Sequence, residues 1–454
     1  MPTTMLKELK RYVAAASLLA LVALVALVAC DSMDDTPDAD TIYFNGNILT
    51  LSPHSQKVTA IAFKNGKVQA IGTRIGVMRH QGDITEVIDL DGQTMIPGFF
   101  AGNSQFSQLL EQTGNIEQTL AAYASQGITT LVDIGIDRKA LEALLNQANA
   151  NKLTLDIIAI PSASELEALA GSGQIKFGQY NNRLKVAGFS LALDGSTNDY
   201  SAWMAYPYQE NPGLPEPNWR SEPLMPFSQF HALFQQAVEY EHQLFIHAMG
   251  DAAIDAIIQA SYDLKINAGQ DQRHVVVMSR FMRNSQIQQY AKLGLIGCFD
   301  TSNIYQDGED DVDKLGLSRA NGQSPLKQAL EDDLPASNIC LPGPNAFNTT
   351  FVLWSAVNRV TKEGEIIGSG LRLSALEALT TMIKHAAFQF FEDETKGELV
   401  PGKLADAVIL SENPMAIAPG LIRDIKVVET IKQGKTIYRR PSASKTQKGD
   451  PPSN

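Results

Sequence analysis

Eight short apolar runs, separated by segments of helical length, constrain the fold of this chain more than any other feature. The runs are nearly continuous in apolar residues rather than alternating, which is typical of parallel strands buried on both faces. Residues 230–240 and 252–264 are two of the helix-length segments between them. Strand and helix in eightfold alternation predict an α/β protein with a TIM-type (β/α)8 barrel, whose chemistry lies where the strands end. The runs are residues 94–100, 129–134, 155–160, 189–193, 243–247, 274–278, 295–299 and 338–341.

The two ends of the chain carry a different, strand-rich pattern. Residues 41–96 contain short alternating strands with the turns Asn45-Gly46 and Asn65-Gly66, a dipeptide that favours hairpins. Residues 406–410 and 427–431 are also strand-like, and the turn Gln433-Gly434 follows them. We therefore expect a small β-sandwich domain built jointly from residues 41–96 and 397–438. The barrel then takes residues 97–396.

The N-terminus has the pattern of a bacterial lipoprotein signal. Three cationic residues precede an unbroken run of apolar and small residues at 13–28, which ends at Cys30. The alternative is an uncleaved transmembrane anchor, which needs about 20 apolar residues. The acidic residues directly after Cys30 favour cleavage of residues 1–29 and lipidation of the Cys30 thiol. We interpret residues 30–40 as a polar tether and residues 439–454 as a disordered tail.

Charge and cysteine content narrow the possible partners. Residues 1–29 carry three positive charges and one negative, so the remaining chain has a net charge of −15, against −13 for the whole. This balance argues against nucleic acid as a partner and leaves the Cys30 lipid as the contact with a membrane. Asp31 after the lipidated cysteine resembles an inner-membrane retention signal, which favours the periplasmic face of that membrane. Cys298 and Cys340 form a disulfide or remain two separate buried thiols, and we favour the separate thiols.

Several motifs occur together in the middle and C-terminal parts of the chain. Residues 396–406 read Lys-Gly-Glu-Leu-Val-Pro-Gly-Lys-Leu-Ala-Asp, and Asn413-Pro414 follows them. Pro97-Gly98-Phe99-Phe100, His247-Ala248-Met249-Gly250-Asp251, Arg273-His274 and Leu193-Asp194-Gly195-Ser196 complete the set. Over about residues 40–438, this combination resembles the amidohydrolase superfamily, and within it the family-3 amidohydrolases, which hydrolyse N-substituted amide-like C–N bonds.

The resemblance implies a site with one or two divalent metals such as zinc, which generate hydroxide and polarise the substrate carbonyl. Aligned position by position, however, only His247 keeps a ligand side chain. The His-x-His pair falls on Asn103 and Gln105, the acid before it on Ala101, and a lysine on Ser190. A second histidine falls on Met278 and the final aspartate on Asn345. The six ligand positions are thus Asn103, Gln105, Ser190, His247, Met278 and Asn345, and we expect no metal cofactor.

Three functions remain compatible with the sequence. The first is a degenerate, non-catalytic amidohydrolase that serves binding or scaffolding at a membrane. The second is a hydrolase of non-peptide C–N bonds with metal-independent chemistry, for which His247 and Asp194 are the first candidates and Asp133 and Asp300 the next. The third is a metal enzyme with shifted ligands, which is disfavoured because no two of the seven histidines stand at close ligand spacing.

The same residues can also have purely structural roles. Asp194 and Asp251 can serve only to cap loops or helices, and His247 can be a hydrogen-bonded remnant. The uncharged groups at the ligand positions suit a small uncharged polar ligand such as an amide or a sugar. They can equally satisfy one another and bind only water. The stretch between Gln105 and Gly127 is also short, because the family usually carries a long insertion there.

Overall fold

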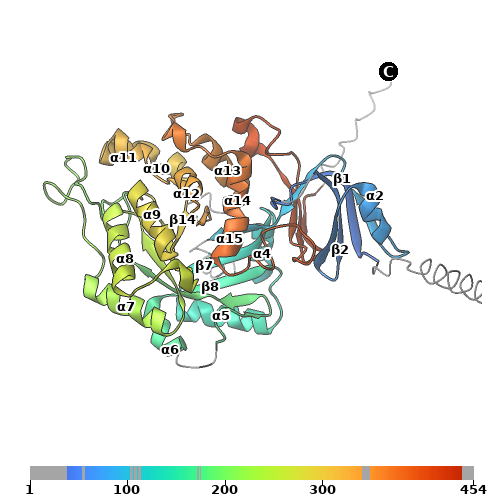
Figure 1. The fold of residues 1–454 in the computed structure, drawn as a ribbon, viewed down its shortest axis with the longest axis horizontal. Coiled ribbons are helices and arrows are strands. Elements are labelled where there is room, and N and C mark those ends of the chain that lie inside the picture. The colour runs from blue at the N-terminus through green and yellow to red at the C-terminus, as the bar shows by residue number, and fades with distance from the viewer. Residues whose placement is uncertain are drawn as a thin grey trace, which may run out of the picture.

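The computed structural model describes residues 38–53, 57–102, 106, 110, 114–170, 173, 175–339 and 348–441. The expected signal, Cys30, Asn103, Gln105, Cys340, Asn345 and most of the expected tail lie outside the described residues. The fold is mixed α/β, and Figure 1 shows a body of strands surrounded by helices beside a smaller, mainly β part. In the described part of the chain, no helix is both long and apolar enough to span a membrane.

The apolar runs of the middle of the chain form two five-stranded sheets, which we call the first and second inner sheets. The second is entirely parallel, and the first is parallel except for a short hairpin of two strands that the sequence did not predict. In spatial order the first contains β6 (Phe99–Gly102), β7 (Ile128–Ile136), β8 (Asp156–Pro161), β10 (Leu184–Val186) and β9 (Tyr180–Asn181). The second contains β11 (Gly188–Ala192), β12 (Gln243–Ala248), β13 (Val275–Met278), β14 (Ile296–Phe299) and β15 (Ala336–Ser337).

Helices follow most of these strands and cover them with apolar faces. In α7 (Phe227–Glu239), for example, Phe230 and Phe234 recur at helical spacing and are fully buried. The other helices of this body are α4 (Ile116–Ala124), α5 (Arg138–Asn149), α6 (Leu166–Ala170), α8 (Asp251–Asp263), α9 (Asn284–Leu293), α10 (Asn303–Leu315), α11 (Leu317–Asn321), α12 (Leu326–Glu331), α13 (Thr349–Asn358), α14 (Ala375–Met382) and α15 (Lys384–Gln389). Short 3-10 helices are η2 (Ala163–Glu165), η3 (Ala268–Gln270), η4 (Ser369–Leu371) and η5 (Pro419–Asp424).

Two of the eight expected strands differ from the sequence prediction. The run at 94–100 breaks at Gly98 into β5 (Thr94–Pro97), which belongs to the terminal sheet described next, and β6. A side chain at Gly98 would place its Cβ 2.1 Å from Thr129 Oγ1, so the close approach of the backbone there requires glycine. The run at 338–341 is also shifted, because β15 ends at Ser337.

The terminal sheet combines strands from both ends of the chain. Its order is β18 (Lys435–Arg439), β17 (Val427–Lys432), β16 (Ala407–Leu410), β5, β1 (Thr41–Ile48), β2 (Val58–Lys64) and β3 (Lys67–Gly72), and β4 (Glu86–Asp89) pairs with β1. The short helices α2 (Arg74–Val77) and η1 (Met78–His80) lie beside it. Both terminal segments therefore contribute to one hydrogen-bonded sheet, because β5 pairs with β1 on one side and with β16 on the other.

A buried ionic network joins the terminal sheet to the first inner sheet. Lys432 Nζ, at the end of β17, lies 2.6 Å from Asp156 Oδ2 on β8 and 2.7 Å from Asp406 Oδ2. Lys396 Nζ contacts the same Asp156 oxygen at 2.6 Å. Although burial opposes ionisation, Lys432 and Lys396 hold the pKa of Asp156 well below its usual range. The network consists of Asp156, Lys185, Glu392, Lys396, Asp406 and Lys432, all nearly inaccessible to solvent.

Cys298 on β14 is fully buried and disulfide-bonded. The expectation of a separate thiol is therefore wrong for this residue. Sequence spacing could not decide the point, because a disulfide depends on the distance between two Cα atoms in the folded chain.

Candidate functional site

The carboxyl ends of the inner strands bring the aligned ligand positions of β11 to β15 into one region. Strand register places Ala192, His247, Val277, Cys298 and Ser337 side by side on neighbouring strands. Paired residues of parallel strands point to the same face of a sheet. Val277 and Cys298 belong to a buried apolar cluster that also includes residues of the first inner sheet. His247 therefore stands in a row of side chains that offers a metal no carboxylate and no second imidazole.

His247 is the one retained ligand, and its surroundings hold it in place. Its Nδ1 lies 3.2 Å from the backbone oxygen of Asp194 and 3.7 Å from Asp194 Oδ1. Its side chain remains 32% exposed, so part of the ring is accessible to solvent. An imidazole in this position can accept or donate one hydrogen bond to a ligand.

Both carboxylate oxygens of Asp194 accept hydrogen bonds from backbone N–H groups. Its Oδ1 accepts from Met249 N at 2.8 Å, and its Oδ2 accepts from Gly250 N at 2.8 Å and Trp203 N at 3.0 Å. Asp251, the first residue of α8, binds Ala205 N in the same way at 2.8 Å. Both carboxylates therefore fix the 202–205 segment to the strand ends, which is the capping role anticipated for them. Neither is placed as an unengaged base.

Ser190 and Met278 occupy the next two aligned positions. Ser190 is buried and its Oγ donates to Pro161 O at 3.3 Å, which uses its one proton inside the protein. Met278 ends β13 with a φ of 79°, and Ser279 follows with a φ of 41°. Such left-handed backbone at two consecutive residues that are not glycine is unusual and costs conformational energy. The end of β13 therefore has an unusual backbone conformation, although the side chain there, Met278, is a thioether and not a histidine.

The final aligned position, Asn345, lies outside the described residues, but another asparagine, Asn338, directly follows β15. Its Oδ1 accepts from Thr301 N at 3.0 Å, and its Nδ2 donates to Thr301 Oγ1 at 2.9 Å. Asn338, like Asn345, offers an amide and not a carboxylate.

Two further aspartates were candidates for metal-independent chemistry. Asp133 lies between Val132 and Ile134, which face the interior cluster, so its side chain points to the opposite face of β7. Asp300 directly follows β14 and is fully buried, and its Oδ1 accepts from Ser302 N at 2.8 Å. Among the described residues its Oδ2 has no hydrogen-bond partner. Burial raises the pKa of Asp300 to about 6.

These donors do not fit a catalytic metal. Zinc sites of this kind use at least three strong protein ligands, which are imidazole, thiolate or carboxylate groups. The six aligned positions supply one imidazole, amides, a hydroxyl and a thioether, and replacing Asn345 by Asn338 adds no carboxylate. Across the described ranges, no three His, Cys, Asp or Glu side chains gather into a group that could hold a metal ion.

The architecture and motifs agree with a comparison to known families. Residues 105–438, most of the chain, match the amidohydrolase family. The chain belongs to this family. The relationship inferred from the motifs at Pro97, His247 and Lys396 is thereby confirmed.

Relatives of this amidohydrolase are distant. Protein LONG AFTER FAR-RED 3 of Arabidopsis thaliana is 27% identical over 56% of this chain and 43% of its own length. An N-substituted formamide deformylase of Arthrobacter pascens is 23% identical over 47% of this chain and 40% of its own length. The chain thus spans less than half the length of these two curated relatives. A metal-dependent hydrolase from Pyrococcus furiosus, uncharacterised in function, shares the fold with a TM-score of 0.71 at 19% identity, over 83% of this chain and 99% of that one.

Proposed function

We propose that this amidohydrolase is a membrane-anchored binding protein that has given up metal-dependent hydrolysis. The observation that carries the proposal is the row of side chains around His247. Where a metal enzyme needs converging charged ligands, Ala192, Val277 and Cys298 present apolar or disulfide-bonded groups. A dicationic metal stripped of water would have a single strong ligand there.

The proposal includes a closed eight-stranded barrel as the scaffold of the site. Two contacts between the inner sheets support it. Ser162, directly after β8, bridges in parallel to Ser190 on β11. On the other side, Gly102 N at the end of β6 donates to Ile339 O, two residues after β15, at 2.7 Å. These contacts extend the pairing from β8 to β11 and from β15 to β6.

The ligand we propose is a small uncharged polar molecule, such as an amide. His247 is a partly exposed hydrogen-bonding group, and the aligned positions offer amides rather than charges. A charged ligand would find no countercharge among these groups, and burying an unpaired charge is costly. The name of the formamide deformylase relative is consistent with an amide-like ligand for this chain.

Metal content tests the proposal directly. We expect the mature protein, purified after growth with added zinc, manganese and iron, to contain well below one equivalent of metal. It should also release no formate from N-substituted formamides. About one equivalent of zinc that disappears in His247→Ala would refute the proposal, since catalytic sites bind stoichiometric metal.

Restoring ligands provides the complementary test. The combined variant Asn103→His, Gln105→His, Met278→His and Asn338→Asp should regain zinc binding. The matched variant with Asn345→Asp in place of Asn338→Asp should bind less, because Asn338 stands at the end of β15. Equal binding by both variants would instead place the final ligand position away from Asn338.

A metal-independent C–N hydrolase is the second candidate, and Asp300 is the observation that favours it. A buried carboxyl with a pKa of about 6, and with one oxygen that has no partner within the described ranges, is suited to general acid–base catalysis near neutral pH. If this function holds, the mature protein releases formate without metal, and Asp300→Asn lowers the rate by two orders of magnitude or more. Absence of formate release by the wild type under all metal conditions would eliminate it.

A further inference from the structure

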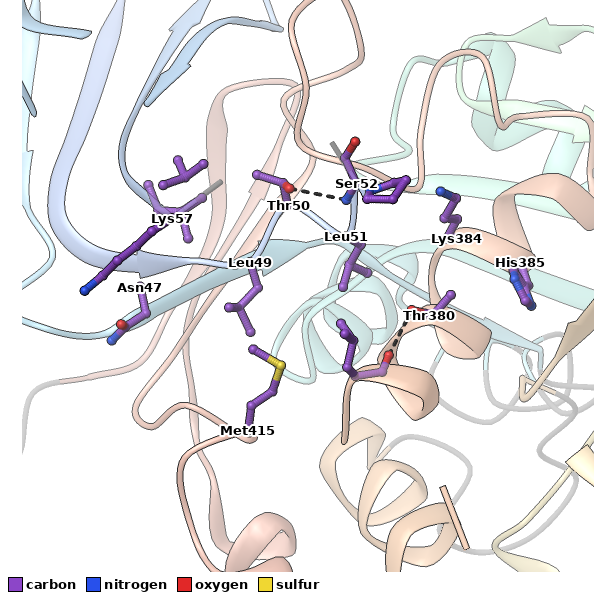
Figure 2. Close-up of a pocket in the computed structure, with 14 residues that line it drawn as sticks. Asn47, Leu49, Thr50, Leu51, Ser52, Lys57, Thr380, Lys384, His385 and Met415 are labelled. Atoms are coloured by element: carbon purple, nitrogen blue, oxygen red, sulfur yellow. Dashed lines mark hydrogen bonds between the residues drawn. The ribbon is translucent and has the colours of Figure 1, made fainter. Parts of the chain in front are cut away.

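A cavity of about 510 Å³ lies between the terminal sheet and helices α14 and α15. None of the candidate residues at the inner strand ends lines it. Figure 2 shows Leu49 and Leu51 in its middle and Met415 beside them, between elements that come from the two ends of the chain. Leu376 and Met415 at its edge are 48% and 46% exposed. The cavity therefore offers apolar walls that are open to solvent.

Positive charge is in excess around this cavity. Lys57 and Lys384 line it, and no aspartate or glutamate is among the described residues of its lining. Lys384 Nζ contacts Glu398 Oε1 at 2.7 Å, but Glu398 Oε2 also contacts Lys403 Nζ at 2.7 Å. One carboxylate thus faces two ammonium groups. Such a surplus stands out in a chain with a net charge of −13.

The remaining polar groups of the cavity are engaged within the protein. Thr380 Oγ1 donates to Leu376 O at 2.8 Å, and Thr50 Oγ1 accepts from Ser52 N at 3.2 Å. His385 Nδ1 lies 2.9 Å from Ala336 O, and burial lowers the pKa of this histidine, so the ring is neutral. The lysine ammonium groups are therefore the main polar groups that can bind a ligand.

Figure 2 places the two lysines at opposite ends of the cavity. Lys384 and His385 stand at one end, and Asn47 and Lys57 stand at the other, with the apolar side chains between them. A ligand that uses both features needs an apolar body and an anionic head. A wholly polar anion would leave the leucine walls in water, and a neutral apolar ligand would leave the surplus cation unmatched.

We propose that this cavity binds an amphipathic anion with a single acyl chain and a carboxylate head, of the chemical class of fatty acids. The acyl chain packs along Leu49, Leu51 and Met415, and the head lies at the Lys384 end, where one carboxylate already serves two lysines. This site goes beyond the function proposed above and is separate from the inner strand ends, so either idea can fail without the other.

Dodecanoate is a suitable probe. The mature chain should carry Cys30→Ala, so that it has no acyl group of its own. Titration followed by calorimetry should show one dodecanoate site, with no site for acetate and weaker binding of dodecyltrimethylammonium, which has the same tail and the opposite charge. Lys384→Gln and Met415→Glu should each raise the dissociation constant tenfold or more.

Matched controls separate this site from general surface effects. Lys327→Gln removes another partly exposed lysine that is paired with a glutamate, Glu377, at 2.6 Å, and Leu421→Glu charges another exposed leucine outside the cavity. Both should leave the dissociation constant within a factor of two. The proposal fails if dodecanoate does not bind, if the cationic amphiphile binds as tightly, or if the control variants weaken binding equally. Met415→Glu changes an exposed position, so it decides the matter even if Lys384→Gln fails to fold.

Discussion

At the scale of single residues, the polar groups near the inner strand ends are largely occupied in holding the structure together. Asp194 binds three backbone N–H groups, Asn338 binds Thr301 twice, and Ser190 binds a carbonyl oxygen. Asp300 is the exception, since one of its oxygens has no partner among the described residues. A buried carboxyl without a partner favours the protonated form, and its effect on stability depends on pH.

Replacing Asp300 by asparagine should change how stability varies with pH. Burial raises the pKa of Asp300 from 3.8 to about 6, so its contribution is fully present below 3.8 and is lost as pH rises through 6. The wild type should lose roughly 2 kcal/mol of unfolding free energy between pH 4 and pH 8 through this group, and Asp300→Asn should not. Urea denaturation of both proteins across this range measures the difference.

The comparison with the variant isolates Asp300 from other titrating groups. Burial lowers the pKa of His274 to about 4, so His274 acts in the opposite sense, and its stabilisation is lost as pH falls below 6.5. Both proteins contain His274, so its contribution cancels in the difference between their unfolding free energies. Asp310→Asn, at an exposed position on α10, serves as the control and should follow the wild type. Parallel pH curves for wild type and Asp300→Asn would contradict the prediction.

At the scale of elements, the ionic network explains part of the C-terminal motif at 396–406. Its first residue, Lys396, and its last, Asp406, are both members of the network. Lys396 contacts Asp156 directly, and Asp406 is linked to Asp156 through Lys432. Asp156 is the first residue of β8, at the amino end of a strand rather than at the carboxyl end where barrel chemistry occurs. The motif therefore has a structural task, which is to join β16 and β17 of the terminal sheet to the first inner sheet.

Lys432→Met should destabilise the protein severely. Lys432 is 1% exposed and contacts both Asp156 and Asp406, so its removal leaves buried negative charge in excess. Breaking a buried pair by removing one partner costs about 3–5 kcal/mol. Lys64→Met is the control, because Lys64 pairs with the half-exposed Asp40 at 3.0 Å, and such surface pairs contribute about 0–1 kcal/mol. Equal losses in urea denaturation would show that the network does not hold the elements together.

At the scale of the whole molecule, the fold joins both ends of the described chain in one sheet and leaves the inner sheets to the middle. Ala39 and Asp40, the last residues of the expected tether, belong to the folded part, because Ala39 is 1% exposed and Asp40 pairs with Lys64 on β2 at 3.0 Å. The proposed lipid on Cys30 would then anchor the protein through the residues that precede Ala39. Stable attachment to a bilayer generally requires more than one acyl chain, which a lipoprotein cysteine provides.

Lipidation can be tested on the exported protein. Mass spectrometry of the mature N-terminus should find Cys30 as its first residue, carrying lipid, and the protein should fractionate with the inner membrane. Cys30→Ala should abolish the lipid, whereas Ser32→Ala should keep it. Membrane association of Cys30→Ala after loss of residues 1–29 would place the anchor elsewhere in the chain.

The sequence by itself determined the family and the positions of most inner strands, and it predicts the loss of the metal ligands. These are local properties: an apolar run predicts a buried strand wherever it pairs, and a side chain either can or cannot donate to a metal. The run at 243–247 became β12, and the helix expected at 252–264 became α8 (Asp251–Asp263), each nearly unchanged. The prediction that His247 is the one retained ligand likewise needed only the motif around it.

Tertiary structure decided what depends on residues distant in the chain. The break at Gly98 follows from the approach of Thr129, and the role of Asn338 follows from where β15 ends. The contact of Lys432 with Asp156 joins residues 276 positions apart, so no pattern of spacing could reveal it. The cavity between β1 and α14 likewise exists only because the terminal sheet packs beside the helices, since a cavity is a property of packed surfaces and not of any segment.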